Sequence, residues 1–211
     1  MEDFTWNIDV NFAKNTNEVL ELPEGLDKIQ LARAPFGGAY LNSVEGATFQ
    51  ELYAYNYVYE DGEKVIDPST GFYATGDLES VGSVLPDYTA GIRNAFKYKN
   101  IELSALIDIS QGGVYYSLTN MWGMYSGMMD ASAYSTSGGN TIREDGLILD
   151  GVLVAEDGTV TENNVPIGGY DFATSFYHGF GTPSATSVFD ASYIKLREVT
   201  LAYTLPKLID L

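Results

Sequence analysis

Carboxylates are the most abundant side chains able to do chemistry in this chain, which has 29 Asp and Glu residues among 211. Two turn segments concentrate them: residues 60–63 read Glu-Asp-Gly-Glu and precede Asp67, and residues 156–158 read Glu-Asp-Gly and precede Glu162. Calcium accepts carboxylate oxygens, but neither segment has the ligand order and final glutamate of an EF-hand loop. We therefore predict solvated turns and no metal site.

Catalytic constellations are missing from the sequence. Glycoside hydrolysis needs two carboxylates at a defined separation across a cleft, and nothing in the spacing of the acidic residues indicates one. His178 is the single histidine and there is no cysteine, so a triad or a multi-histidine metal site has too few members. The glycine pairs at 37–38, 112–113 and 168–169 lack the lysine of a phosphate-binding loop. We predict no catalytic residues, no enzyme activity and no cofactor.

Three aromatic residues are the candidates for substrate binding: Trp122, Tyr125 and Tyr134. They lie in or beside a short helix predicted over residues 122–133, which is followed by a flexible stretch at 135–140. Exposed rings can stack on sugar rings and on peptide side chains. The alternative is that these rings fill the core of a packed loop.

The composition excludes several classes of protein. With only 11 Lys and Arg residues the net charge is −18, which repels nucleic acid and anionic lipid headgroups. No apolar run approaches the roughly 18–20 residues of a membrane-spanning helix. The first residues lack the basic and apolar regions of an export signal. Because 22 glycines and 16 tyrosines favour strands and turns over helices, the predicted fold class is all-β.

Residues 4–12 alternate without an error between apolar and polar side chains. Phe4, Trp6, Ile8, Val10 and Phe12 share one face, which is the period of a β-strand. The length matches the roughly 9–11 residues of a tilted transmembrane strand, and the polar face suits a wet lumen. A soluble β-sandwich alternates in the same way, so this strand alone leaves both folds open.

A β-hairpin is predicted at 88–109, with Lys99 and Asn100 as its two loop residues. This turn sets a strand register that places apolar residues opposite one another on one face of the hairpin and a Lys–Glu pair on the other face. The pairs are Tyr98 with Ile101, Phe96 with Leu103, Ile92 with Ile107, and Lys97 with Glu102. Two residues break the pattern, Asn94 on the apolar face and Leu106 on the polar face.

Two further strands are predicted, at 52–59 and at 191–205. The second changes parity between Leu196 and Val199, which indicates a β-bulge or a strand end that rises beyond a bilayer. Aromatic residues lie near strand ends, where outer-membrane barrels carry their interfacial girdles. They are Tyr88, Tyr98, Tyr193 and Tyr203. Cross-strand packing in a soluble sheet would explain them equally well.

The connections between the predicted strands differ greatly in length. Two residues join the hairpin strands, whereas residues 111–190 show weak periodicity and are rich in Gly, Ser, Asn and Asp. Short turns on one side and long loops on the other are typical of outer-membrane barrels. We therefore predict a long extracellular loop region at 111–190.

Three blocks of sequence, at residues 82–91, 98–115 and 190–206, follow one another along the chain and together resemble the SusC/RagA family of TonB-dependent transporters. Residues 82–91 are similar to the family pattern G-x-x-x-P-D-[WY]-x-x-G, and residues 98–115 follow it with Tyr-Lys-Asn, Leu-Ser, Ile-Asp and Gly-Gly-Val-Tyr in the family's order. Residues 190–206 read Asp-Ala-Ser-Tyr-Ile-Lys-Leu-Arg-Glu-Val-Thr-Leu-Ala-Tyr-Thr-Leu-Pro, which is similar to the family's late strand block. The resemblance covers most of the chain and is weakest at 17–52 and 111–190.

The resemblance implies a fold and a set of partners. It implies antiparallel strands of a partial transmembrane β-barrel, about five or six strands of a roughly 22-stranded parent barrel. Residues 1–211 are then a partial barrel domain without the plug, the signal peptide and the last strands. The implied parent lies in the outer membrane of a Gram-negative-type bacterium and imports oligosaccharides or peptides with a SusD-like surface lipoprotein and TonB.

A soluble all-β carbohydrate-binding module is the alternative. Such a module has turn signals every 8–12 residues and a closed apolar core, and the unequal connections disfavour it. A set of five or six strands cannot close into a barrel, and open edges leave unpaired backbone groups that are costly in lipid. We therefore expect the isolated chain to aggregate or to form a partly folded sheet.

Overall fold

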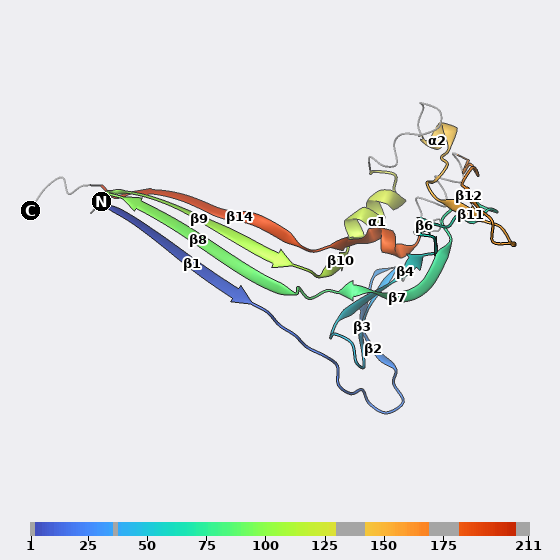
Figure 1. Cartoon of the computed structure of the whole chain (residues 1–211), viewed down its shortest axis with the longest axis horizontal. Coiled ribbons are helices and arrows are strands. Elements are labelled where there is room, and N and C mark those ends of the chain that lie inside the picture. The colour runs from blue at the N-terminus through green and yellow to red at the C-terminus, as the bar shows by residue number, and fades with distance from the viewer. Residues whose placement is uncertain (1–2, 36–37, 130–141, 169–181, 206–211) are drawn as a thin grey trace, which may run out of the picture.

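The computed structural model describes residues 3–35, 38–129, 142–168 and 182–205. Its strands are antiparallel in every named sheet. Four long strands form one elongated sheet, and the remaining elements gather at one end of it (Figure 1). The predicted all-β class is therefore confirmed, and no helix among the described residues is long and apolar enough to cross a membrane.

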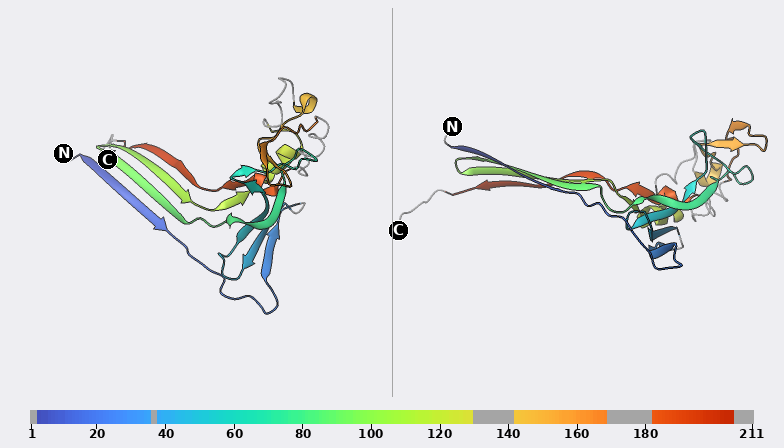
Figure 2. Two further views of the ribbon diagram at one scale, coloured as in Figure 1. Left: turned by 45° about the vertical axis from the view of Figure 1, so that its right-hand side comes forward. Right: turned by 60° about the horizontal axis from the view of Figure 1, so that its bottom comes forward.

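The elongated sheet, called the wall below, has the strand order β1-β8-β9-β14. Its strands are β1 (Phe4–Ala13), β8 (Tyr88–Tyr98), β9 (Ile101–Gln111) and β14 (Tyr193–Tyr203). The short β8–β9 turn lies beside the start of β1 and the end of β14, and both long connections leave the opposite end (Figure 2). One short turn facing two long connections is the loop asymmetry of outer-membrane barrels.

The predicted hairpin is confirmed together with its register. Tyr98 pairs with Ile101, Phe96 with Leu103, Ile92 with Ile107, and Lys97 with Glu102. The turn closes because Lys99 adopts a positive φ of 52°, and its backbone N–H donates to the carbonyl of Asp3. The two-residue turn therefore fixes which side chains of β8 and β9 share a face.

The predicted bulge in the last strand is also confirmed. The register of β14 against β9 shifts between Leu196 and Glu198, so Arg197 is the extra residue. Because one inserted residue reverses the parity of those that follow, Ile194 and Leu196 share a face with Val199 and Leu201. The apolar side of β14 is continuous for this reason.

The wall holds four strands, and the strand predicted at 52–59 lies elsewhere. It divides into β4 (Glu51–Tyr57) and β5 (Tyr59–Glu60). β4 belongs to a second sheet, called the loop sheet below, with the order β2-β3-β4-β7. Its other strands are β2 (Lys28–Arg33), β3 (Ala39–Val44) and β7 (Thr75–Ser83). Residues 14–87 therefore form a second long connection, which the alternation of residues 52–59 did not reveal.

Smaller elements complete the two connections. β5 pairs with β6 (Glu63–Lys64), β10 (Val114–Tyr116) with β13 (Val188–Asp190), and β11 (Val152–Val154) with β12 (Val160–Glu162). The helices are α1 (Leu118–Tyr125), α2 (Ile142–Asp145) and the 3-10 turn η4 (Ser184–Ser187). The region predicted as a long loop at 111–190 thus contains regular structure, and residues 135–140 lie outside the described residues.

The predicted helix at 122–133 begins too late. α1 starts at Leu118 because the Ser117 hydroxyl accepts a hydrogen bond from the N–H of Asn120, which satisfies a donor of the first turn. The helix ends at Tyr125, and Gly127 adopts a φ of 67° just beyond it. Residues 130–133 lie outside the described residues.

A small apolar core joins the two connections. Ile66, Leu149 and Ile167 are buried together, and Phe72, Tyr73, Met124, Leu147 and Leu153 pack against them. Ile66 comes from the first connection, whereas Leu149 and Ile167 come from the second. The backbone N–H of Ile66 also donates to the carbonyl of Val152, so the two connections share a hydrogen bond as well as a core.

Candidate functional site

One face of the wall is apolar from end to end and exposed. The paired registers place every second side chain of each strand on this face. They are Phe4, Trp6, Ile8, Val10 and Phe12 of β1, then Ile92, Phe96 and Tyr98 of β8, then Ile101, Leu103, Ile107 and Ile109 of β9, and Ile194, Leu196, Val199, Leu201 and Tyr203 of β14. Val10, Ile194 and Leu201 are 66%, 76% and 73% exposed. Soluble monomers rarely expose so extensive an apolar face.

Aromatic side chains lie at both ends of the apolar face. Trp6 stacks on Phe96 with ring centroids 5.8 Å apart near the short turn, and Phe12 lies 5.4 Å from Tyr88 near the long connections. The unexpected Asn94 has a partner, because its Oδ1 accepts a hydrogen bond of 3.3 Å from the indole Nε1 of Trp6. Two aromatic bands flanking an apolar zone are the pattern of a membrane-facing barrel surface.

Tyr193 does not belong to these bands, so its assignment to a girdle was wrong. It pairs with Ser110, and its hydroxyl donates to Asp108 Oδ2 at 3.3 Å on the polar face. The bulge at Arg197 is the cause, since it reverses the parity of β14 between Tyr193 and Tyr203. Arg197 also forms an ion pair with Asp108. The polar face near β14 is therefore a hydrogen-bonded and ion-paired surface.

The three sequence blocks that carry the family resemblance converge where the wall meets its connections. The N–H of Asp87 donates to the carbonyl of Gln111 at 2.8 Å, and the N–H of Gly112 donates to Ser192 Oγ at 2.8 Å. The Ser192 backbone N–H in turn donates to Asp190 Oδ1 at 2.7 Å. Hydrogen bonds from the Ser192 hydroxyl and backbone lower the pKa of Asp190, so this carboxylate stays ionised. We call this group of residues the junction.

Glycine is required at the junction for two reasons. Gly112 and Gly113 adopt φ values of 77° and 82°, which L side chains rarely adopt. A Cβ on Gly112 would also lie 2.5 Å from Asp87 Oδ2, and one on Gly113 would lie 3.3 Å from the carbonyl oxygen of Leu85. The Gly-Gly of the second block and the Pro-Asp of the first are therefore two halves of one close backbone contact.

Two of the three predicted substrate-binding residues lie together on α1. Trp122 and Tyr125 are 40% and 38% exposed, and their rings meet edge to face with centroids 5.2 Å apart. Their helix is held against the rest of the connection by Asn120, whose side-chain N–H donates to Ser187 Oγ, and by Met124 at the small core. Tyr134 and His178 lie outside the described residues. Trp122 and Tyr125 thus remain candidates for binding.

The two connections are also joined by Tyr57 of β4. Its hydroxyl lies 2.5 Å from Thr186 Oγ1 of η4, and the neighbouring N–H of Tyr55 donates to Ser184 Oγ at 2.9 Å. Burial raises the pKa of Tyr57, so its hydroxyl stays protonated and available as a donor. These bonds attach the loop sheet to the segment that leads into β13.

Removing the Tyr57 hydroxyl tests this attachment. We expect Tyr57→Phe to weaken it by about 1 kcal/mol, the net value of a neutral hydrogen bond. Hydrogen exchange of the backbone amides at 184–187 should then quicken by roughly fivefold. Tyr55→Phe in the same strand is the control and should leave that rate unchanged. Equal exchange rates at 184–187 in Tyr57→Phe and Tyr55→Phe would show that the hydrogen bond between Tyr57 and Thr186 contributes nothing to the attachment.

A pocket of about 540 Å³ lies between the turn that follows β6 and strand β11. Its walls are mostly apolar, with Ile66, Phe72 and Val154 among them, and Asp67, Thr70 and Tyr73 supply the polar groups. The sequence marked Asp67 only as a turn residue. Val154 lies 79 positions beyond Thr75 in the sequence. No local sequence pattern could therefore have predicted that these residues line the same pocket. Among the described residues no group of three His, Cys, Asp or Glu side chains can hold a metal ion.

Comparisons with known proteins agree with this architecture. No family model matches the chain. It is 26% identical over 233 residues to TonB-dependent receptor P3 of Formosa agariphila and 24% identical over 226 residues to TonB-dependent receptor P26 of the same organism. These alignments cover 98% and 97% of the chain but 20% of each relative. The chain therefore spans about one fifth of the length of the curated relatives it matches.

Solved structures show the same fold. A structure of the RagAB peptide transporter superposes with a TM-score of 0.59 at 19% identity, over 97% of this chain and 21% of that one. A second structure, of the RagAB peptide importer in an "open-open" state, gives a TM-score of 0.54 at 20% identity. The fold and the two-faced wall define the class: the chain has the structure of part of a TonB-dependent receptor, namely barrel strands and the connections between them. Within that class the resemblance to the SusC/RagA family is confirmed.

Proposed function

We propose that the chain forms a section of wall and two external connections of an outer-membrane importer that depends on TonB. The observation that carries the proposal is the apolar face of the wall, which is exposed across four hydrogen-bonded strands and flanked by aromatic bands. In a bilayer this face would contact lipid, while the polar face would line the barrel interior. The alternative of a soluble carbohydrate-binding module would need a second layer to cover the apolar face.

The proposed partners follow from the relatives. Two are described as TonB-dependent receptors and two solved structures as a peptide transporter or importer. We infer that the intact protein takes energy from TonB, works with a SusD-like surface lipoprotein and imports oligosaccharides or peptides, in the outer membrane of a Gram-negative-type bacterium. The described part of the chain contributes wall and binding surface to that task, and we propose no catalytic step for it.

The net negative charge is concentrated in the two connections and not in the wall, as a membrane-spanning wall with exposed connections requires. The connections at 14–87 and 112–192 contain 22 acidic and 5 basic residues, which is −17 of the total net charge of −18. The wall is therefore close to neutral, as a surface in contact with lipid should be. Exposed acidic residues on the external connections keep them soluble.

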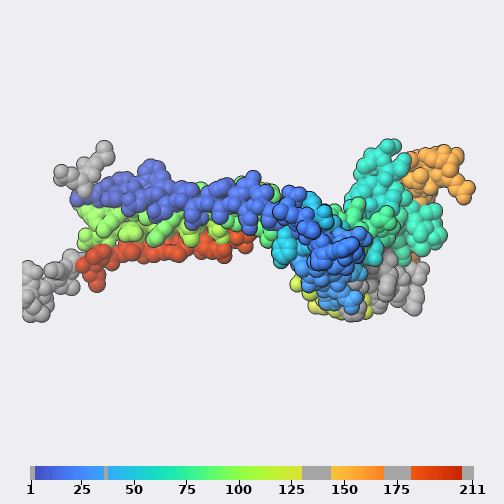
Figure 3. Space-filling model, turned by 90° about the horizontal axis from the view of Figure 1, so that it is seen from below, coloured from blue at the N-terminus to red at the C-terminus, as the bar shows by residue number. Residues whose placement is uncertain are grey.

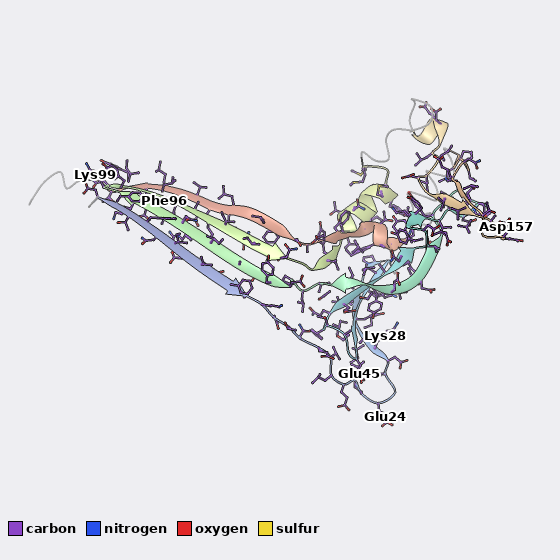
Figure 4. All side chains as sticks on the ribbon, viewed as in Figure 1. Glu24, Lys28, Glu45, Phe96, Lys99 and Asp157 are labelled. Atoms are coloured by element: carbon purple, nitrogen blue, oxygen red, sulfur yellow. The ribbon has the colours of Figure 1, made fainter. Side chains whose placement is uncertain are left out.

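Cysteine labelling tests the proposed topology, because residues 1–211 contain no cysteine and unmodified protein labelled in parallel shows the background. Asp157 lies at the outer tip of the β11–β12 turn, and Lys99 lies at the opposite end of the molecule (Figure 4). We expect a membrane-impermeant maleimide to label Asp157→Cys in intact cells, and to label Lys99→Cys only after the outer membrane is permeabilised.

Both single-cysteine variants should react fully in denaturant, which controls for their expression and reactivity. The proposed orientation would be wrong if Lys99→Cys were labelled in intact cells while Asp157→Cys was protected. Equal labelling of both variants in intact cells would show that the wall does not span the membrane.

A further inference from the structure

We propose that the pocket between the turn after β6 and strand β11 binds a primary ammonium group attached to an apolar chain, as at the amino terminus of a peptide. This inference rests on the proposed function, because it narrows the imported substrate to one that carries positive charge. Three observations support it: a fixed carboxylate in the wall of the pocket, apolar neighbours, and the small number of basic residues in the two connections.

Asp67 supplies the fixed negative charge. Its Oδ1 accepts hydrogen bonds from the N–H and the hydroxyl of Ser69, at 2.8 and 2.6 Å. These bonds lower the pKa of Asp67, so the carboxylate is ionised at neutral pH. Its main chain is equally constrained, because the carbonyl accepts from the N–H of Gly71 at 2.8 Å and the N–H donates to Phe72. A carboxylate held in place loses little entropy when it binds a cation.

The aromatic rings beside the pocket are already occupied by the ammonium group of Lys64. Lys64 Nζ lies 4.1 Å from the ring centroid of Tyr57 and 5.1 Å from that of Tyr73, and Tyr73 lines the pocket. Tyr73 itself carries no charge, since burial raises its pKa to about 12, with Tyr57 and Asp150 adding to the effect. Because these ring faces already hold the ammonium group of Lys64, the carboxylate of Asp67 is the group left to bind the ammonium group of a ligand.

The remaining walls suit the chain that carries the ammonium group. Val65, Pro68, Phe72 and Val154 line the same pocket. They would contact the apolar part of a peptide, whereas a sugar ring presents hydroxyl groups that need hydrogen-bonding partners. The pocket is therefore better matched to an aminoacyl end group than to a neutral sugar.

Few basic residues are present to bind an anion instead. Lys64 is the single basic residue in the sequence between 34 and 87, and Arg143 of α2 is the single one between 112 and 192. The lysine is already placed over two rings. Space-filling shows the segments around residues 60–80 and 150–165 standing together at one end of the molecule (Figure 3). Their excess of carboxylates attracts cations and repels sulfated or uronic acid chains.

The test is a pair of variants that remove the same charge from two similar turns. Asp67→Asn keeps the oxygen that accepts from Ser69, so the turn is preserved while the charge is lost. Asp157→Asn is the control, because Asp157 Oδ1 also accepts from a backbone N–H two residues on, that of Thr159, and does not line the pocket. Binding of trialanine and of N-acetyl-trialanine is measured by calorimetry, with the whole protein extracted from outer membranes into detergent.

We expect trialanine to bind unmodified protein about tenfold more tightly than N-acetyl-trialanine, and Asp67→Asn to abolish that difference. Asp157→Asn should preserve it. Glucosamine, which places the same ammonium on a sugar, should bind more weakly than trialanine.

Equal binding of the two peptides by unmodified protein would overturn the inference without any variant. Equal effects of the two substitutions would overturn it too, since general charge rather than Asp67 would then be responsible. Tighter binding of glucosamine than of trialanine would overturn the choice of a peptide as the ligand of the pocket. None of these results affects the proposed wall and loop topology, which the cysteine labelling tests independently.

Discussion

An arginine at Val199 should destabilise the intact protein in a bilayer. Val199 lies on the apolar face, in the central row formed by Ile8, Asn94, Ala105 and Val199, and is 58% exposed. A charged side chain at the middle of a lipid-facing barrel surface costs about 2–4 kcal/mol. We expect Val199→Arg to lower the free energy of unfolding of the intact protein in lipid vesicles by that amount, as measured by urea titration.

The next residue along the strand provides the control. Thr200 faces the polar side, where its hydroxyl donates to Glu198 Oε1 at 2.8 Å. An arginine there meets water and a carboxylate, so Thr200→Arg should change the free energy of unfolding by less than about 1 kcal/mol. If both variants unfold at the same urea concentration, the apolar face does not contact lipid.

Substitution of Gly112 should loosen the second connection from the wall. Alanine at this position would adopt a φ of 77° and place its Cβ 2.5 Å from Asp87 Oδ2. The left-handed conformation costs about 1–2 kcal/mol, and the overlap adds roughly 1–3 kcal/mol. We expect Gly112→Ala to increase the rate of limited proteolysis within residues 112–192, with the wall strands remaining protected.

Substitution of Gly158 separates the cost of the left-handed backbone conformation from the cost of the steric overlap. It has a φ of 82°, but a Cβ there meets no atom within 4 Å. Gly158→Ala therefore imposes a similar backbone cost without the overlap and should have the smaller effect. Removing the obstructing carboxylate with Asp87→Ala should partly rescue Gly112→Ala, as a double-mutant cycle would measure. Additive effects of the two substitutions would show that no contact joins the first and second blocks.

Local periodicity was sufficient to predict the wall. The alternation at 4–12, the two-residue turn at Lys99-Asn100 and the parity change before Val199 each follow from strand geometry, and the structure confirms all three. Tyr193 was misplaced because the same parity change was not applied to the residues before it. The face of a residue beyond a bulge depends on where the extra residue lies, and Arg197 has no sequence feature that marks it.

The arrangement of the connections was beyond the reach of the sequence. Residues 52–59 alternate like a wall strand, yet β4 pairs with β3 and β7, since alternation identifies a strand and not its neighbours. The pocket depends on contacts between the turn at 65–75 and Val154, and the small core on Ile66, Leu149 and Ile167. Such contacts follow from tertiary packing of segments far apart in sequence. Trp122 and Tyr125 were found by residue type, and their substrate-binding role remains a prediction.

The junction explains why three separated blocks can mark one family of proteins. Asp87, Gly112 and Ser192 lie more than 100 positions apart at the extremes, yet each contributes a backbone or side-chain group to the same hydrogen-bonded contact. Their spacing in sequence reflects only the lengths of the strands and connections between them.

The unequal connections also decide which parts of this architecture can change in length. The register of β8 against β9 is set by the two residues Lys99 and Asn100, so inserting one residue there would move every apolar side chain of one strand to the wrong face. Each doubling of a long connection, by contrast, costs only about 0.6 kcal/mol of loop-closure entropy. The two connections can therefore gain or lose segments, and with them new binding groups, while the wall keeps its dimensions.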